Sequence, residues 1–299
     1  MPSPRRISQP HDERRFLLLA NERARRGNAL ATLRDLLQQP PLSGQQAVVA
    51  PFVDDEGIHR GLAQLDRDMI PVAVGGDGTV TSVARMLREA GLSEQPMGVL
   101  PLGTGNGLTH SLGIRNLRQA ADVLAHGQPV DLDLLTTTHP QAPVSLLSIS
   151  VGLESLVMAD FSSRRSRSLL LGGMLACCHL PKGLSGVSVR ADGQSVLEPG
   201  EVFCNIGLYN MPCYGFGILP RPAADPADGA ADLRLHRSRL PYLAYMSAAL
   251  IRAASPMAQP PWSRVRHVEL STHLPVQVDG ESLAPATFEI DVIPGGLRV

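Results

Sequence analysis

The sequence predicts two domains, an α/β domain followed by a mostly β domain. Its 299 residues exceed the size at which one ordinary hydrophobic core is expected. Strand-like and helix-like segments alternate over residues 16–130, whereas short apolar runs between Pro, Gly and Asp turns dominate residues 131–299. Residues 1–15 are mostly polar and predict a mobile tail. We therefore expect the domains to span residues 16–130 and 131–299.

The first domain begins in β-α-β-α-β order. Its five segments are Phe16–Ala20, Ala29–Leu37, Ala47–Val53, Ile58–Arg67 and Val72–Val74. From Val80 to Leu87, apolar residues recur at i, i+3, i+4 and i+7, which predicts an amphipathic helix that stops near Gly91. Met97–Leu100 then predicts a strand, and Asn106–Leu112 and Leu117–Ala125 predict two short helices.

The second domain is predicted to consist mainly of strands. The strand-like runs are Val130–Leu134, Val144–Val151, Val187–Arg190, Val202–Leu208, Leu233–His236, Val265–Leu270, Val276–Asp279 and Thr287–Val292. One helix is predicted among them, Pro241–Ala254, because this segment is rich in Leu, Ala and Met and lacks internal breakers. We expect the final strand to return toward the first domain.

Composition excludes several classes of protein. The net charge of −1, from 27 Lys and Arg against 28 Asp and Glu, argues against a nucleic-acid partner. Lys182 is the only lysine and the G-x-x-x-x-G-K-[ST] pattern is absent, which excludes an ordinary P-loop. The four cysteines lack metal-ligand spacing and are expected to be reduced.

We expect a cytoplasmic protein. The longest apolar stretch, Leu169–Cys178, is shorter than the ~20 residues of a bilayer span, and no long apolar segment suggests secretion. The basic cluster Ser162–Arg167, which precedes the apolar run Leu169–Leu175, could hold the protein peripherally at the inner membrane face. A solvated loop before a packed segment is the alternative for this stretch.

Two glycine-rich segments carry the main functional signal, Val74–Thr79 and Leu100–Asn106. Each follows a strand-like run, so each is expected at a strand's carboxyl end, where open α/β sheets bind ligands. Glycine lets backbone N–H groups approach an oxyanion closely, and Asp77 adds a carboxylate that could reach a phosphate-bound Mg²⁺. Together the two segments predict a site for a nucleoside triphosphate.

The second segment distinguishes between families that share a Gly-Gly-Asp-Gly-Thr loop, among them nicotinamide-nucleotide kinases and phosphofructokinases. Pro101–Asn106 followed by Leu112–Ile114 resembles the diacylglycerol kinase catalytic-domain superfamily, which includes bacterial diacylglycerol kinases and sphingoid-base kinases. The resemblance extends over almost the whole chain. Its further motif positions are Asn21, Gly27, Asn205, Gly215, Gly217, Pro220, Asp228, Gly229 and Asp279-Gly280-Glu281.

The resemblance implies a Rossmann-like first lobe of the phosphofructokinase and NAD-kinase type, a β-sandwich second lobe and an active cleft between them. It also implies ATP as phosphate donor and Mg²⁺ as cofactor. Asp77 would support the nucleotide-bound Mg²⁺, and Asn21 would shape the nucleotide pocket. Gly75, Gly76, Asp77, Gly78, Thr79 and Thr104 would hold the ATP phosphates, and the further nucleotide-binding positions would be Gly103, Gly105 and Asn106.

By the same resemblance, Glu281 would be the general base that takes the proton of an acceptor hydroxyl, with Asp279 as the alternative. A lipid hydroxyl has a pKa far above 7 and does not lose its proton unaided at neutral pH. A carboxylate placed beside the hydroxyl is therefore a chemically sensible general base. Taken alone, Asp279-Gly280-Glu281 would be typical of a hairpin turn between Val276–Val278 and Thr287–Ile290.

The family also uses a structural Mg²⁺ in its second lobe. The matching positions are the carboxylate of Asp228 and the backbone carbonyls of Asp225 and Ala230. The alternative is that Asp225-Pro226 and Asp228-Gly229 are simply turns, which is what these dipeptides form most often.

The chain departs from the family pattern at Thr81, Ser82 and Gly107, where relatives commonly carry amide or acidic side chains. Our leading hypothesis is an ATP-dependent kinase for a diacylglycerol-like or sphingoid lipid at the membrane surface. A kinase for a soluble metabolite and a non-catalytic nucleotide or lipid sensor are the alternatives. The sequence leaves the oligomeric state open, with a homodimer as one option.

Overall fold

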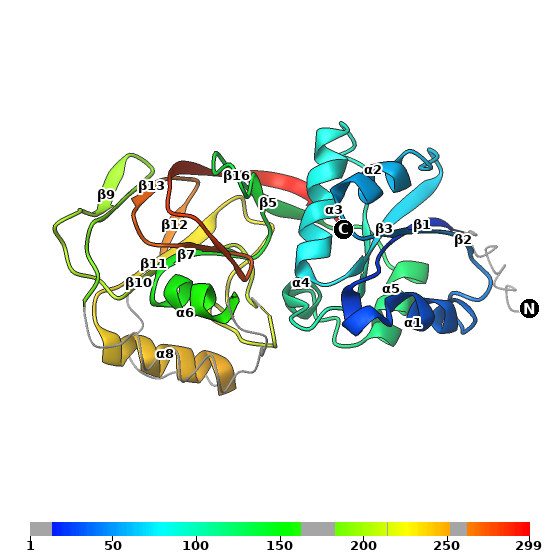
Figure 1. Ribbon diagram of the computed structural model, residues 1–299, viewed down its shortest axis with the longest axis horizontal. Helices are drawn as coiled ribbons and strands as arrows, with labels where there is room; N and C mark the ends of the chain where they lie inside the picture. Colours follow the sequence, from blue (N-terminus) through cyan, green and yellow to red (C-terminus); the bar gives the residue numbers. More distant parts are fainter. Residues whose placement is uncertain (1–13, 163–182, 214, 252–261) are drawn as a thin grey trace, which may run out of the picture.

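The computed structural model describes residues 14–162, 183–213, 215–251 and 262–299, and the chain forms two lobes that lie side by side (Figure 1). Most of the predicted tail falls outside these residues, but its last residue, Arg15, already belongs to the first strand. Apart from Ser162, the basic cluster and the apolar run after it also lie outside the described residues. No helix among the described residues is long and apolar enough to cross a membrane.

The first lobe contains a four-stranded parallel sheet in the order β2-β1-β3-β4. The strands are β1 (Arg15–Asn21), β2 (Gln46–Phe52), β3 (Met69–Gly75) and β4 (Gly98–Pro101). Helices pack on both faces, so the central strands β1 and β3 are almost continuously apolar. The helices are η1 (Ala24–Gly27), α1 (Ala29–Leu37), α2 (Asp55–Leu62), α3 (Asp77–Glu89), α4 (Gly107–Ser111) and α5 (Leu117–His126).

Alternate side chains of β1 enter two different hydrophobic clusters. Leu17 and Leu19 pack in the cluster that includes residues of α2 and α3. Leu18 packs in the cluster that includes residues of α1 and α5. This alternation follows from the period of two in a strand, and it places α2 and α3 on one face and α1 and α5 on the other. The predicted α/β order of this lobe is confirmed.

The second lobe is a sandwich of two antiparallel sheets with strand orders β12-β11-β10-β7-β14-β15 and β6-β5-β16-β13-β8-β9. Its elements are β5 (Asp131–Thr137), β6 (Val144–Ser145), β7 (Ser148–Gly152), α6 (Leu153–Ser162), β8 (Val187–Ala191), β9 (Gln194–Leu197), β10 (Asn205–Tyr209), β11 (Ala231–His236), α8 (Arg239–Ile251), β12 (Ser263–Val265), β13 (His267–Thr272), β14 (Val276–Val278), β15 (Glu281–Leu283) and β16 (Thr287–Arg298). Ile149 and Ile206 of one sheet share a core with Val189 and Ile290 of the other, which confirms the predicted sandwich.

The structure differs from the sequence prediction at several places in this lobe, and β9 is a strand that was not predicted. Helix α6 was not predicted, because its sequence is apolar nearly all round and carries no amphipathic period. The predicted strand Val144–Val151 is split into β6 and β7, and Val265–Leu270 is split into β12 and β13, which belong to different sheets. The hairpin partner of β14 is β15, not Thr287–Ile290 as expected, because β16 pairs with β13 and β5.

The last strand connects the two lobes. Figure 1 shows β16 running from the second lobe to the first beside β5. Its end reaches the first lobe, where the backbone N–H of Met97 donates to the carbonyl of Arg298 at 2.9 Å. Leu297 packs in the same core cluster as Val80 and Leu108 of the first lobe and Leu147 and Met211 of the second. The domain boundary at residue 130 stays a prediction.

Candidate active site

The two glycine-rich loops touch each other at the carboxyl ends of β3 and β4. A Cβ added to Gly76 would lie 3.0 Å from the Cα of Gly103, and a Cβ added to Gly103 would overlap the Cα of Gly76. The backbone N–H groups of Leu102 and Gly103 both donate to the carbonyl of Gly75, at 2.8 and 3.1 Å. Because the loops are in backbone contact, their peptide groups line one common surface, as the sequence predicted.

Asp77 lies between the two loops at the N-terminus of α3. Its Oδ1 accepts a hydrogen bond from the N–H of Leu108 at 3.2 Å, and a Cβ on Gly105 would lie 3.0 Å from its Oδ2. Burial raises the pKa of Asp77, although the N–H groups of Gly107 and Leu108 act in the opposite direction. Among the described residues Asp77 makes no ion pair. A half-buried carboxylate of this kind fits a divalent cation that accompanies phosphates.

Asn21 contacts the first loop directly. It ends β1, and its side-chain amide donates to the hydroxyl of Thr79 at 2.9 Å. Thr79 in turn packs against the backbone of Gly75, where any Cβ would overlap its side chain. The structure therefore brings Asn21 to the loop by way of Thr79, and Thr79 itself is buried. Thr104, by contrast, is exposed at the tip of the second loop, where it is open to a ligand.

The side chain of Asn106 braces the second loop. Asn106 has a φ of 51°, in the left-handed region, which turns the chain into α4. Its Oδ1 accepts from the N–H of Gly103 at 3.1 Å and its Nδ2 donates to the carbonyl of Gly103 at 3.0 Å. Since both ends of the amide are used within the loop, Asn106 shapes the loop rather than presenting its side chain to a ligand.

Glu281 reaches the first loop from the other lobe. Residues Asp279 and Gly280 form a two-residue hairpin turn between β14 and β15, with φ values of 48° and 86°. Immediately after this turn Glu281 is exposed, and its Oε1 lies 3.3 Å from the position of a Cβ on Gly78. A carboxylate from the β lobe and the glycine loop of the α/β lobe therefore meet at the junction of the lobes.

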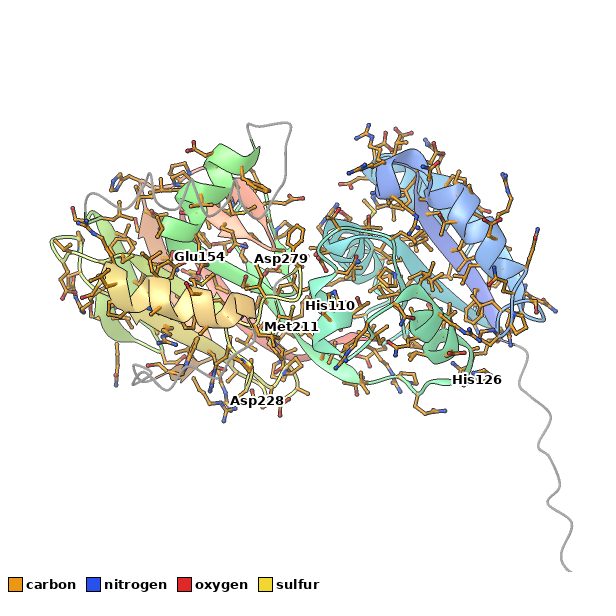
Figure 2. The ribbon with its side chains drawn as sticks, turned by 90° about the horizontal axis from the view of Figure 1, so that it is seen from below. His110, His126, Glu154, Met211, Asp228 and Asp279 are labelled. Atoms are coloured by element: carbon orange, nitrogen blue, oxygen red, sulfur yellow. The ribbon has the colours of Figure 1, made fainter. Side chains whose placement is uncertain are left out.

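The carboxylate of Asp279 is occupied by the protein itself. Its Oδ1 accepts from the hydroxyl of Ser145 and from the N–H groups of Leu147 and Ser148, at 2.8, 2.8 and 3.1 Å. Its Oδ2 accepts from the N–H of Leu146 at 2.8 Å and from the hydroxyl of Thr81 in α3 at 3.2 Å. Figure 2 shows Asp279 at the side of the second lobe that faces the first. These contacts favour a role for Asp279 in positioning Glu281.

We expect Asp279→Asn to lower the free energy of unfolding by about 3 kcal/mol, because an amide NH₂ would face N–H donors that now share a carboxylate. Urea unfolding followed by circular dichroism measures this change. The matched control is Asp68→Asn, at an exposed position just before β3, which should stay within about 0.5 kcal/mol of the wild type. Equal stability of the two variants would contradict the positioning role.

The predicted second-lobe Mg²⁺ position is a turn held by protein contacts. The carboxylates of Asp225 and Asp228 accept from the N–H groups of Ala227 and Ala230, each at 3.1 Å. Arg264 also pairs with Asp228 at 2.6 Å. The described residues contain no group of three or more His, Cys, Asp or Glu side chains that could hold a metal. In this structure the carboxylate of Asp228 is engaged by Arg264 and by the N–H of Ala230, and the Mg²⁺ position at Asp225, Asp228 and Ala230 stays a prediction.

Several residues of this site were not predicted as functional. Thr81, which departs from the family pattern, joins α3 to Asp279. The backbone N–H of Phe216 donates to the carbonyl of Gly105 at 3.0 Å, and the hydroxyl of Ser111 bonds to the backbone of Cys213. Gly105 lies in the second loop and Ser111 ends α4, and both contact a segment more than 100 positions away, so no local pattern in the sequence could have found these contacts.

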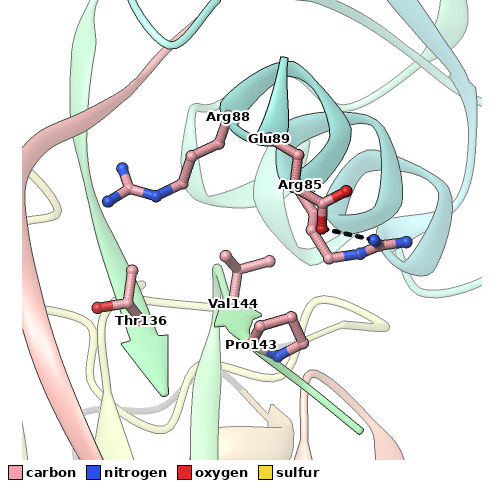
Figure 3. Close-up of a pocket in the computed structure, with 6 residues that line it drawn as sticks. All are labelled: Arg85, Arg88, Glu89, Thr136, Pro143 and Val144. Atoms are coloured by element: carbon pink, nitrogen blue, oxygen red, sulfur yellow. Dashed lines mark hydrogen bonds and ion pairs between the residues drawn. The ribbon is translucent and has the colours of Figure 1, made fainter. Parts of the chain in front are cut away.

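A separate hollow of about 420 Å³ lies farther along the junction of the lobes (Figure 3). It is lined by Arg85, Arg88 and Glu89 from α3 and by Thr136, Pro143 and Val144 from the second lobe. Arg85 is bonded to Glu89 at 2.8 Å. None of the glycine-loop residues lines this hollow, so we do not place the reaction there.

Comparisons with known proteins agree with this arrangement. The sequence model of the family described as "Diacylglycerol kinase catalytic domain" matches residues 15–137. A Pseudomonas aeruginosa protein named "Probable lipid kinase YegS-like" is 30% identical over 258 residues, which cover 82% of this chain and 78% of that protein. A "Diacylglycerol kinase" of Mycobacterium tuberculosis is 27% identical over 239 residues, 76% of this chain and 75% of the relative.

Solved structures show the same fold. The crystal structure of a diacylglycerol kinase from Bacillus anthracis matches with a TM-score of 0.68 and 17% identity, over 97% of both chains. The parallel lobe with paired glycine loops and the β-sandwich lobe, together with these relatives, define the class of protein as a two-lobed kinase, a phosphotransferase. The chain belongs to the diacylglycerol kinase catalytic-domain family.

Proposed function

We propose that this protein transfers the γ-phosphate of ATP to a hydroxyl of a diacylglycerol-like or sphingoid lipid at a membrane surface. The observation that carries the proposal is the approach of the Glu281 carboxylate to the backbone of Gly78, across the junction of the lobes. A phosphate held by the loop's N–H groups and a hydroxyl beside Glu281 would then be neighbours, which is what an in-line transfer requires.

The chain's own groups would have three tasks in this reaction. The glycine loops would hold the phosphates with backbone N–H groups, since the chain has no lysine in the loops. Glu281 would take the proton of the acceptor hydroxyl as the hydroxyl oxygen attacks phosphorus. Asp77 would hold Mg²⁺, which when bound offsets negative charge on the phosphates.

The proposal is tested by incubating the purified protein with γ-labelled ATP, Mg²⁺ and mixed micelles that contain diacylglycerol or a sphingoid base. We expect a labelled phospholipid whose formation requires the lipid. Labelling of a soluble alcohol without any micelle would favour a metabolite kinase instead. Binding of ATP with no turnover on any lipid would contradict the proposal and favour a sensor.

A further inference from the structure

The sheet β12-β11-β10-β7-β14-β15 has an unusual covered face. Its inward side chains, such as Val151, Ile206 and Leu233, form the sandwich core. The opposite face lies beneath α6 and α8, whose residues Leu153, Tyr242 and Tyr245 pack together over it. That face is nevertheless polar and buried, with relative exposures of at most 8% at Ser148, Ser150, Asn205, Tyr209, Asp232, Arg234, His236 and Gln277.

Most polar groups on this face have partners. The hydroxyl of Ser150 donates to Gln277 Oε1 at 2.8 Å. The hydroxyls of Tyr209 and Tyr242 donate to Glu154 Oε1 at 3.0 and 2.9 Å. These bonds satisfy the buried Glu154, as expected for a polar group removed from water. Buried polar atoms on this face that lack a hydrogen-bond partner therefore require an explanation.

Three neighbouring side chains carry nitrogen atoms without a hydrogen-bond partner, although the Oδ1 of one of them, Asn205, accepts from the N–H of Glu154 at 3.0 Å. The atoms are Nε and Nη1 of Arg234, Nε2 of His236 and Nδ2 of Asn205. Asn205 and His236 are directly opposite each other in the register of β10 and β11, and Arg234 lies two residues before His236 on the same face. Burial and the nearby Arg234 lower the pKa of His236 to about 3, so its ring is neutral at pH 7.

Among the described residues, Arg234 makes no ion pair. Asp232, the acidic residue on the same strand, pairs with Arg221 at 2.9 Å. The guanidinium of Arg234 instead stacks between two aromatic rings, with Cζ at 4.3 Å from the centroid of Tyr245 and 4.7 Å from that of Trp262. Arginine does not give up its proton in a protein, so a 3% exposed guanidinium without a carboxylate calls for an anion.

We propose that this face holds a phosphate-class oxyanion, bound by Arg234, His236 and Asn205 beneath α8. A guanidinium, the amide N–H₂ of Asn205 and His236 in the tautomer that carries its proton on Nε2 match the several acceptor oxygens of a phosphate. Hydrogen bonds from a charged guanidinium to a phosphate are stronger than bonds between neutral groups. Among the described contacts, none of the three residues touches the glycine loops or Glu281. The three residues therefore lie apart from the groups that would hold ATP, and the ligand could be free phosphate or the phosphate of a lipid.

The test uses the full chain in phosphate-free buffer. Trp262 is the only tryptophan of the protein and is in contact with Arg234, so its fluorescence reports on the site. Inorganic phosphate and monomeric dioctanoyl phosphatidic acid are titrated separately, and thermal unfolding is recorded in parallel. We expect a saturable change in Trp262 fluorescence and a rise in Tm of about 5 °C at 100-fold excess over Kd.

Two variants separate this site from other phosphate sites. Arg234→Met should remove both responses and keep its fold, since an apolar side chain of similar length suits a buried position. Arg237→Met is the matched control, because Arg237 is half-exposed and paired with Glu201, and it should respond like the wild type. Phosphate held by the glycine loops would persist in Arg234→Met, so the difference between the two variants isolates the proposed site.

The outcomes are distinct. An Arg234-dependent response to inorganic phosphate supports the proposal with a free anion as ligand, and a response only to phosphatidic acid supports it with a lipid phosphate. The absence of a saturable response to either probe in the wild type would overturn the proposal. An equal response in Arg234→Met would overturn it as well.

Discussion

Replacing Glu281 with glutamine should lower kcat by about 10²- to 10⁴-fold and leave the KM for ATP nearly unchanged. Glutamine keeps the size of the side chain but cannot accept the hydroxyl proton as phosphorus is attacked. Glu281 belongs to the β lobe and none of the groups that would hold the phosphates is removed, so we expect the loss to fall on kcat and not on the KM for ATP.

Steady-state kinetics with the lipid that gives the highest wild-type rate measures this effect. Glu289→Gln is the matched control, since Glu289 is an exposed glutamate of the same lobe on β16, and it should retain the wild-type kcat. A wild-type kcat in Glu281→Gln would contradict the assignment of Glu281 as the general base. An equal loss in Glu289→Gln would mean that the change acts through general electrostatics of the lobe.

Replacing Gly103 with alanine should abolish nucleotide binding and lower the free energy of unfolding by about 3 kcal/mol. The added Cβ would overlap Gly76 Cα and lie 2.8 Å from Asn106 Oδ1. Backbone atoms cannot move aside as a flexible side chain can, so the two loops must separate. The N–H groups that would surround the phosphates then lose their common surface.

Isothermal titration with MgATP and urea unfolding measure the two parts of this prediction. Gly44→Ala is the matched control, because no atom lies within 4 Å of a Cβ at that position. It should bind nucleotide and unfold like the wild type. Retained binding in Gly103→Ala would show that contact between the loops is not needed for the site.

The first lobe could be predicted well from the sequence because its signals are local. The apolar runs of β1 and β3 and the apolar stripe of α3 arise from neighbours within a few residues. The two glycine loops follow directly on β3 and β4, so their shared location could be deduced from parallel strand order.

In the second lobe, local sequence patterns did not predict all of the structure. The apolar run Val144–Val151 predicts one strand, but the N–H groups of Leu146 and Leu147 turn toward Asp279 and divide it. Asp279 itself looked like an alternative base, whereas its carboxylate is surrounded by protein donors from two distant segments. Hydrogen bonds between residues more than 130 positions apart leave no pattern that a reader of the sequence can detect.

The order of residues alone predicted the α/β and β composition and the glycine loops, because propensity, periodicity and backbone freedom are properties of short segments. The acid at position 281 was singled out only by the family resemblance, since the segment by itself is typical of a hairpin turn. The tertiary structure alone decided that Glu281 meets Gly78, that Thr81 donates to Asp279, and that Arg234 is buried with no ion pair among the described residues. Those facts depend on how two lobes and two covering helices pack, and packing joins residues without regard to their separation in the chain.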